Sequence, residues 1–144
     1  MHGDESMGES GFTVEPIGVI RSALTSREAA PRQGYEGAPE AWLEIAAPMA
    51  QSLVGIVAAD ELIILTWLHR AQRDVRQVHP RGNLDAPMTG VFATRSPDRP
   101  NPVGLHRVSV LEVAGLRLRV APMEAIDGTP VVDIKPVLAR SDDR

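Results

Sequence analysis

The sequence Gly90-Val-Phe-Ala-Thr-Arg-Ser-Pro-Asp-Arg-Pro-Asn-Pro-Val-Gly104 joins a strand-like start to a polar loop with three prolines. Val91 and Ala93 alternate with Phe92 and Thr94, which predicts that the stretch begins as a strand. Each proline fixes its own φ and biases the residue before it towards extended geometry, so the loop loses little entropy on binding. Its arginine, aspartate and asparagine side chains predict a preorganised polar site. The alternative is a rigid turn between two strands whose charged groups are merely solvated.

Composition describes one globular domain without cysteine chemistry. The chain has 144 residues, of which 43% are hydrophobic, and no cysteine. We expect a disordered tail over 1–11, a single domain over 12–140 and a short tail over 141–144. The absence of cysteine excludes disulfides and thiolate catalysis and fits a cytoplasmic protein. No run reaches the length of a membrane span, and the N-terminus lacks a signal-peptide pattern.

The charge is unevenly distributed along the chain. The net charge is −4, but residues 67–107 hold seven arginines against three aspartates, a local charge of +4. A basic middle in an acidic chain suits an anionic substrate that meets one face of the protein. A solvated arginine face is the alternative on charge alone.

The order of patterns predicts a mostly β protein. Strands are expected within 12–22, 41–45, 61–70, 90–94, 105–113, 116–120 and 131–138, and a short helix over 48–57. The strand over 61–70 is apolar on both faces, as in a central strand, and ends in two polar residues. Apolar positions slip within 105–113, which indicates a bulge. Asp127-Gly128 marks a turn. We therefore expect a small closed β-barrel of about seven strands with one short helix and long functional loops.

Several kinds of chemistry lack support in the sequence. His69, His79 and His106 with Asp127 match no dense metal-ligand spacing, so we expect no metal. Ser96 has no evident base beside it in sequence. The chain contains neither the Gly-x-Gly-x-x-Gly pattern of Rossmann cofactor sites nor a phosphate-binding P-loop. What remains is a set of polar loops at strand ends, over 31–33, 69–70, 94–101 and 127–130.

These loops carry a resemblance to a known family. The matching segments are Ile17-Gly-Val-Ile-Arg-Ser22, Pro31-Arg-Gln33, the stretch from Gly90 to Leu105, and Asp127-Gly-Thr-Pro-Val-Val-Asp-Ile-Lys-Pro136. In this order and spacing they resemble the TrmO (YaeB, VirR-like) family of S-adenosylmethionine-dependent methyltransferases, which methylate N6 of threonylcarbamoyladenosine next to the tRNA anticodon. The resemblance covers nearly everything from Val14 to Asp143.

The resemblance implies a β-barrel methyltransferase, unrelated to the Rossmann type, that works as a homodimer with S-adenosylmethionine near the subunit interface. It also implies the residues that line the cofactor: Pro31, Arg32, Gln33, His69, Arg70, Arg95, Leu105, Asp127, Gly128, Thr129 and Pro130. Arg32 or Arg95 can pair with the carboxylate of the cofactor, and a carboxylate near the sulfonium would stabilise its positive charge.

Methyl transfer to a urea-like nitrogen needs positioning and a proton acceptor. The candidate acceptors are Asp98, His69 and His106, and the sequence does not choose between them. Arg99, Asn101 and Arg107 are candidates for binding the substrate, which is expected to be tRNA. Two alternatives stay open at this stage: the same fold and cofactor acting on a small-molecule acceptor, and a non-enzymatic β-barrel module that binds nucleic acid or a ligand.

Overall fold

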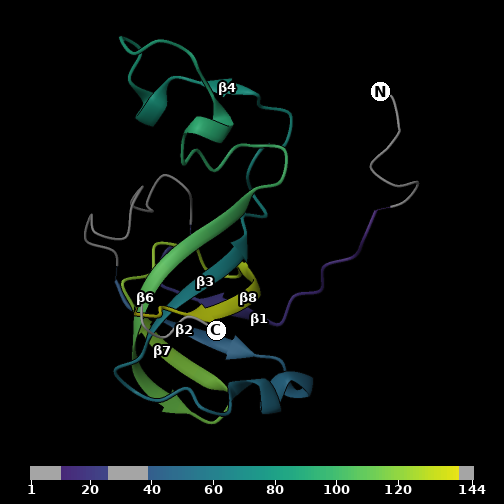
Figure 1. Cartoon of the computed structure of the whole chain (residues 1–144), viewed down its shortest axis with the longest axis vertical. Helices are drawn as coiled ribbons and strands as arrows, with labels where there is room; N and C mark the ends of the chain where they lie inside the picture. The colour runs from purple at the N-terminus through teal and green to yellow at the C-terminus, as the bar shows by residue number, and fades with distance from the viewer. Residues whose placement is uncertain (1–10, 26–38, 140–144) are drawn as a thin grey trace.

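A computed structural model describes residues 11–25 and 39–139, and its centre is a closed barrel of six antiparallel strands (Figure 1). The strands follow one another around the barrel in the order β1-β2-β7-β6-β3-β8. Their bounds are Gly18–Arg21 for β1, Ala41–Ile45 for β2, Glu61–Trp67 for β3, Val103–Ala114 for β6, Arg117–Ala121 for β7 and Pro130–Pro136 for β8. Closure leaves no unpaired sheet edge. The prediction of a mostly β, closed barrel is confirmed.

The longest strand, β6, holds the two sides of the barrel together. It pairs with β3 from Val103 to Ser109 and with β7 from Ser109 to Ala114. The register against β7 shifts between Val110 and Glu112, which confirms the bulge expected from the slipped apolar positions. The turn into β7 contains Gly115 at φ +65°, a conformation that suits glycine. β6 therefore reaches from the lower rim of the barrel to its upper end (Figure 1).

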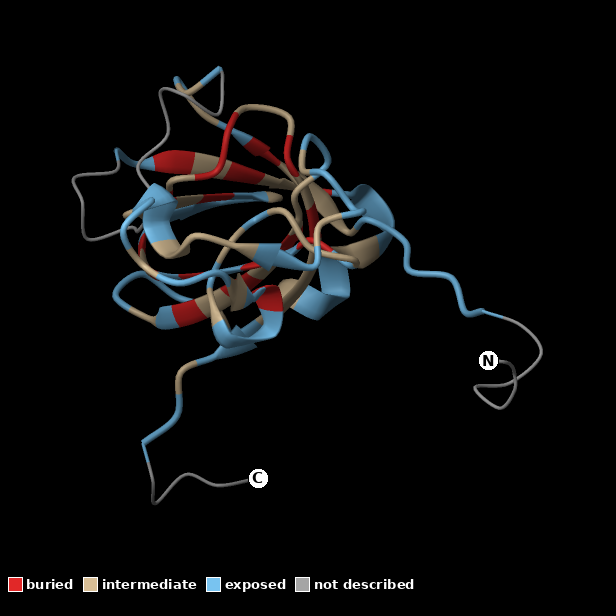
Figure 2. Cartoon of the chain, turned by 90° about the horizontal axis from the view of Figure 1, so that it is seen from above, coloured by how far each residue is buried: buried red, intermediate tan, exposed pale blue. Residues whose placement is uncertain are grey.

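The core lies inside the barrel, on alternate residues of each strand. On β3, Leu62, Ile64 and Thr66 are buried, and their neighbours in sequence are more exposed. Leu43 of β2 and Leu118 of β7 are also fully buried. Figure 2 shows buried segments, drawn in red, recurring along the strands of the barrel. Each fully buried aliphatic side chain of this size contributes about 1.5–3 kcal/mol through removal from water.

Some elements differ from their predicted bounds. Strand β1 is confined to Gly18–Arg21, because Pro16 lacks the amide hydrogen that pairing would require and residues 11–16 are exposed. The predicted helix is a 3-10 helix, η3, over Ala47–Leu53, with Pro48 in its first turn as expected. The expected strand over 90–94 is wrong: strand pairing is confined to β5 (Thr89–Gly90), and Val91–Ala93 form the 3-10 turn η5.

Residues 68–102, which we call the arm, connect β3 to β6 and extend beyond the upper end of the barrel (Figure 1). The arm contains the two-stranded sheet of β4 (Gln77–Val78) with β5, and the 3-10 turns η4 (Pro80–Gly82) and η5. With these two short strands the described residues form eight strands, six of them in the barrel, against about seven expected.

The tails predicted over 1–11 and 141–144 lie outside the described residues, except for Gly11. Within the described ranges, no helix is long and apolar enough to cross a membrane.

Candidate functional site

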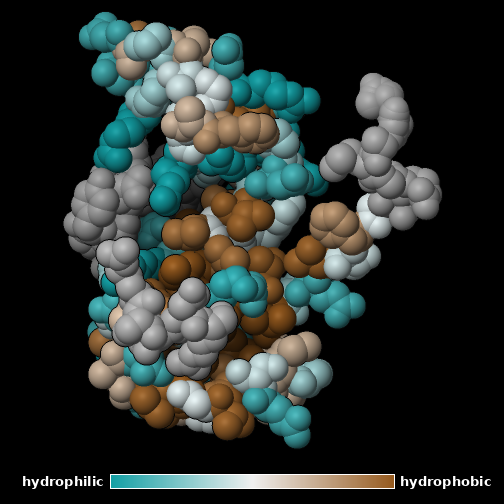
Figure 3. Space-filling view, in the orientation of Figure 1, coloured by the Kyte–Doolittle hydropathy of each residue, from teal (hydrophilic) through white to brown (hydrophobic). Residues whose placement is uncertain are grey.

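A cleft of about 1400 Å³ lies where the arm meets the upper end of the barrel. Its walls come from three places: the arm, the first residues of β6, and the segment before β8 that includes Glu124, Ala125, Ile126 and Thr129. Of the residues that the structure describes, four arginines line it, at positions 70, 81, 95 and 99. Figure 3 shows hydrophilic side chains predominating over the arm, above a more apolar surface on the barrel. The cleft therefore combines positive charge with apolar walls.

The proline loop in the arm is held by its own arginine. Arg99 donates from Nη1 to the carbonyls of Thr94 (3.1 Å) and Ser96 (2.9 Å), and from Nη2 to the carbonyl of Val91 (2.6 Å). The same Val91 carbonyl accepts from the amide of Thr94, which closes the η5 turn. The guanidinium of Arg99 thus organises the loop from within, and this explains why residues 91–93 turn rather than extend.

A second set of contacts ties this loop to the start of the arm. The Asp98 carboxylate accepts from the Gln72 amide at 2.8 Å, and the Arg99 amide donates to the Gln72 carbonyl at 3.0 Å. Arg73 donates to the Pro100 carbonyl (2.7 Å) and to Oδ1 of Asn101 (2.9 Å), with its guanidinium 5.0 Å from the ring centre of Trp67. These contacts join residues about 26 positions apart into one preorganised unit.

At the floor of the cleft, three polar side chains form a connected network inside the end of the barrel. Nε2 of His106 lies 2.7 Å from Oγ1 of Thr66, and Nδ1 of His106 lies 2.6 Å from Oε2 of Glu124. Thr66 is fully buried and His106 is 4% exposed, whereas the Glu124 side chain is 17% exposed. The network places its carboxylate at the boundary between the core and the cleft.

The backbone of β6 allows this network to form. Gly104 pairs with Thr66 across the sheet. A Cβ at position 104 would collide with Oγ1 of Thr66 and would lie 2.8 Å from Nε2 of His106. Glycine at this position therefore leaves the space in which the threonine and histidine side chains meet.

The structure brings many of the predicted site residues together in the cleft. Those that line it are His69, Arg70, Arg95, Arg99, Leu105, His106 and Thr129. Asp98 and Asn101 lie in the arm with their side chains in the loop contacts described above. Arg107 points to the outer surface, where it pairs with Glu61 at 2.7 Å. Pro31, Arg32 and Gln33 lie outside the described residues.

The Asp127 motif acts on β1 as much as on the cleft. Oδ1 of Asp127 accepts from the Ser22 amide at 3.0 Å, and the Gly128 amide donates to the Ile20 carbonyl at 2.8 Å. Gly128 has φ +87°, so the predicted Asp-Gly turn is confirmed. Within this motif, Thr129 lines the cleft, whereas Asp127, Gly128 and Pro130 are not among its lining residues.

Two members of the floor network, Thr66 and Glu124, were not anticipated from the sequence. A signal was present for Glu124, because it is the single charged residue in the otherwise apolar run 121–126. A charged residue inside an apolar segment is costly to bury unless it has a partner. The partner here is His106, which lies 18 positions earlier in the chain.

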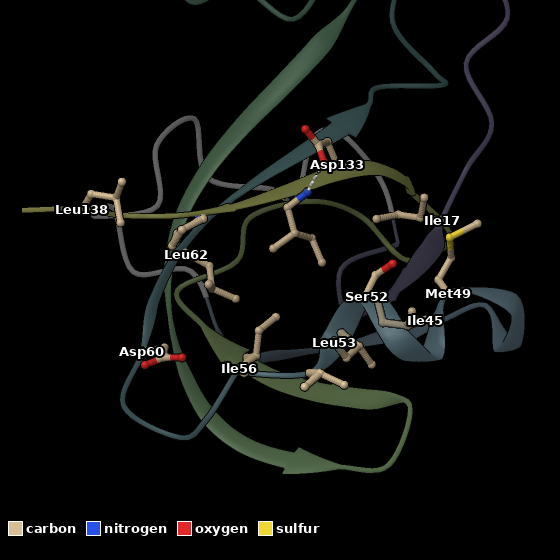
Figure 4. Close-up of a pocket in the computed structure, with 14 residues that line it drawn as sticks. Ile17, Ile45, Met49, Ser52, Leu53, Ile56, Asp60, Leu62, Asp133 and Leu138 are labelled. Atoms are coloured by element: carbon tan, nitrogen blue, oxygen red, sulfur yellow. Dashed lines mark hydrogen bonds between the residues drawn. The ribbon is translucent and has the colours of Figure 1, made fainter. Parts of the chain in front are cut away.

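A smaller pocket of about 510 Å³ lies at the other end of the barrel, between η3 and strands β3 and β8 (Figure 4). Leu53, Ile56 and Leu62 converge on it, and its charged members are Asp60 and Asp133. No arginine, lysine or histidine of the described residues lines this pocket. An anionic ligand would find no counter-charge there, which makes the cleft the better candidate site.

Two of the three histidines considered as metal ligands are hydrogen-bonded to other groups of the protein. His79 in the arm has Nδ1 2.9 Å from the Ala86 carbonyl, and His106 belongs to the floor network. Over residues 11–25 and 39–139, no three metal-ligating side chains gather into a possible site.

The fold and the cleft together define a small β-barrel with a positively charged ligand-binding cleft at one end. Residues 19–143 match the family model of the tRNA-methyltransferase O N-terminal domain, and the chain belongs to this family. The resemblance seen in the sequence is therefore confirmed.

Relatives of known name and structure agree with this assignment. A protein of Methanothermobacter thermautotrophicus, named a probable S-adenosyl-L-methionine-binding protein, is 42% identical over 90% of this chain and 93% of its own length. The tRNA (adenine(37)-N6)-methyltransferase of Escherichia coli is 39% identical over 90% of this chain and 59% of its own length. The crystal structure of TrmO from Pseudomonas aeruginosa aligns with a TM-score of 0.73 at 32% identity, covering 96% of this chain and 62% of that chain. The chain thus spans about three-fifths of these last two proteins.

Proposed function

We propose that this chain is an S-adenosylmethionine-dependent methyltransferase that methylates N6 of threonylcarbamoyladenosine at position 37 of tRNA. Membership of the tRNA-methyltransferase O family supports this proposal, as do the printed names of relatives that bind S-adenosylmethionine or methylate adenine 37 of tRNA. The observation that carries it is the cleft itself, where four arginines and one carboxylate of the described residues line a space large enough for a cofactor and a nucleoside.

The residues of the cleft fit S-adenosylmethionine in kind. Arg70 and Arg95 can bind its carboxylate, since a guanidinium pairs bidentately with such a group. Leu68, Ile126 and Leu105 provide an apolar wall against which an adenine ring can lie. When bound, the cofactor supplies an electrophilic methyl group on a sulfonium. We also propose that Asp127, Gly128 and Pro130 contribute by fixing Thr129 at the edge of the cleft.

The contribution of the protein is to position and orient the two substrates. The Arg99 and Arg73 contacts hold the proline loop of the arm in place, so this part of the cleft wall is organised before any ligand arrives. In-line transfer requires the acceptor nitrogen within about 3–3.5 Å of the methyl carbon, and a fixed wall lowers the entropy lost in reaching that geometry. Although the net charge of the protein is −4, the arginines of the arm give it a local positive charge that attracts the phosphates of tRNA. We expect this reaction to take place in the cytoplasm.

We further propose that the protein works as a homodimer with the cofactor near the interface. In support of this, Val103 and Leu105, at the start of β6 and at the edge of the cleft, are 45% and 49% exposed. Apolar side chains gathered at a site edge are often covered by a partner. Light scattering after gel filtration should give about twice the mass of one chain, and a monomer at all concentrations tested would contradict the dimer.

The first test is calorimetry with S-adenosylmethionine on the wild type and on Arg95→Ala. Loss of a charge-assisted pair of about 1.5–3 kcal/mol predicts a Kd raised roughly 10- to 150-fold. The matched control is Arg107→Ala, which removes the same side chain from the outer surface, where it pairs with Glu61. The Kd of this control should stay at the wild-type value.

The methyl acceptor is tested by transfer of labelled methyl to tRNA with and without the threonylcarbamoyl group. The proposal expects label only in the modified tRNA. Tight cofactor binding without transfer to any tRNA would instead favour a small-molecule acceptor. No binding of S-adenosylmethionine by the wild type would remove the enzyme hypothesis altogether.

A further inference from the structure

Glu124 is the single carboxylate among the described residues that line the cleft. The other charged groups there are arginines, and Asp98 and Asp127 have their carboxylates bonded to backbone amides outside the lining. Among the described residues, a reaction that releases a proton in this cleft therefore meets one acidic side chain able to take it. This chemical isolation makes Glu124 the first group to consider.

The contacts of Glu124 hold its carboxylate in one orientation. His106 lies 2.6 Å from Oε2 through Nδ1, and its other ring nitrogen, Nε2, lies 2.7 Å from the Thr66 hydroxyl. With the proton of a neutral imidazole on Nδ1, the ring donates to Glu124 and accepts from Thr66, so both ring nitrogens have a partner. This assignment follows from the hydrogen-bond network. No other described residue contacts Oε1 within hydrogen-bond distance, so this oxygen can receive a proton from a ligand.

The same contacts exclude His106 as the direct acceptor, since both of its nitrogens are engaged. His69 lines the cleft but is exposed to water, and no hydrogen bond orients its ring among the described residues. A general base must be held within hydrogen-bond reach of the proton that it removes, so an oriented group is favoured over a free one. Of the titratable side chains that line the cleft within the described ranges, Glu124 best combines orientation with partial exposure.

We propose that Glu124 is the catalytic residue that accepts the proton from the methylated nitrogen, with His106 and Thr66 as positioning residues. This inference rests on the proposed function. As the N–H bond breaks, an O–H bond forms on Oε1 of Glu124, and the nitrogen uses its electron pair for the new bond to the methyl carbon. The sulfur of the donor keeps the pair of the broken carbon–sulfur bond. The acceptor is thereby specified as a nitrogen that carries a hydrogen, as in a urea or a carbamoylated amine.

The decisive variant is Glu124→Gln, assayed with tRNA that carries threonylcarbamoyladenosine. The amide oxygen can still accept from Nδ1 of His106, but the side chain can no longer take up a proton. The rate of methyl transfer at saturation should fall about 100- to 10,000-fold, the usual contribution of general-base catalysis. The Kd for S-adenosylmethionine and for S-adenosylhomocysteine should each remain at its wild-type value. Glu112→Gln is the control, because Glu112 pairs with Arg119 on the outer surface.

A second variant separates proton transfer from a structural role. In Glu124→Ala, added formate should restore part of the rate, since a small carboxylate can enter the vacated space, whereas chloride at the same concentration should not. Lost transfer without formate rescue would overturn the inference, as would transfer by Glu124→Gln close to the wild-type rate. Weaker binding of S-adenosylmethionine but not of S-adenosylhomocysteine would also overturn it, by assigning Glu124 to the sulfonium charge. A wild type that binds the cofactor but methylates no tRNA overturns the proposed function, and this inference with it.

Discussion

Replacing Gly104 by alanine should destabilise the protein by about 2–6 kcal/mol, the sum of overpacking and of broken buried hydrogen bonds. The added Cβ would collide with Oγ1 of Thr66 and approach Nε2 of His106 to 2.8 Å. Neither side chain can move aside at low cost, because both are buried and are bonded to each other. The free energy of unfolding, from urea denaturation followed by circular dichroism, measures the effect.

The matched control is Gly90→Ala. Gly90 has φ −59°, and an added Cβ would meet no atom within 4 Å. This variant should therefore unfold at or slightly above the wild-type urea concentration, with a gain of at most about 1 kcal/mol from the stiffer unfolded chain. Equal stability of the two variants would mean that the threonine and histidine side chains do not meet beside Gly104.

Gly104→Ala should lower the activity of the folded protein as well as its stability. If Glu124 takes up the proton, displacing His106 turns the carboxylate away from the cleft while the barrel still closes. At a temperature where the variant is fully folded, methyl transfer should still be reduced more than about tenfold, because small misplacements of catalytic groups have large effects on rate. A rate of methyl transfer equal to that of the wild type in the folded variant would mean that the network of Thr66, His106 and Glu124 does not contribute to catalysis.

The barrel could be predicted from the sequence because each strand has its own pattern of apolar residues within a short stretch. The run 62–65 is apolar and contains two β-branched isoleucines, and the alternation at Leu118 and Val120 fixes which face of β7 is buried. The same period-two rule places His106 on the inward face with Val108 and Val110, so its burial could also have been read from the sequence. The rule says nothing, however, of the partner that a buried histidine will find.

The conformation of the arm could not be predicted because it depends on side-chain contacts that follow no periodic pattern in the sequence. Residues 91–94 alternate over too short a stretch to define a strand, and the carbonyl of Val91 is instead captured by the guanidinium of Arg99. The pairing of Gln72 with Asp98 joins positions that no sequence period relates. Likewise, Glu124 becomes a site residue only when the turn between β7 and β8 carries it to His106. Side-chain capture of backbone groups across a loop leaves no periodic signal in one sequence.

Truncation of Ile64 to alanine should also cause a large loss of stability, about 2–5 kcal/mol. Ile64 is fully buried at the centre of β3 and lies opposite His106 on β6 and Ile134 on β8. Two strands pack against it, so the cavity left by the missing atoms cannot collapse without parting a paired strand. A melting temperature lower by on the order of 10 °C, measured by scanning calorimetry, is the expected result.

Ile63→Ala supplies the comparison, since it removes the same atoms from the next residue of the same strand. Ile63 faces outward, between Arg107 and Lys135 of the neighbouring strands, and is only partly buried. Its change should cost about 1 kcal/mol, mostly lost β-propensity, which both variants share. The difference between the two variants therefore measures burial inside the barrel alone. Equal losses would mean that β3 does not present alternate faces to core and solvent, and the inward placement of His106 and Thr66 would fall with it.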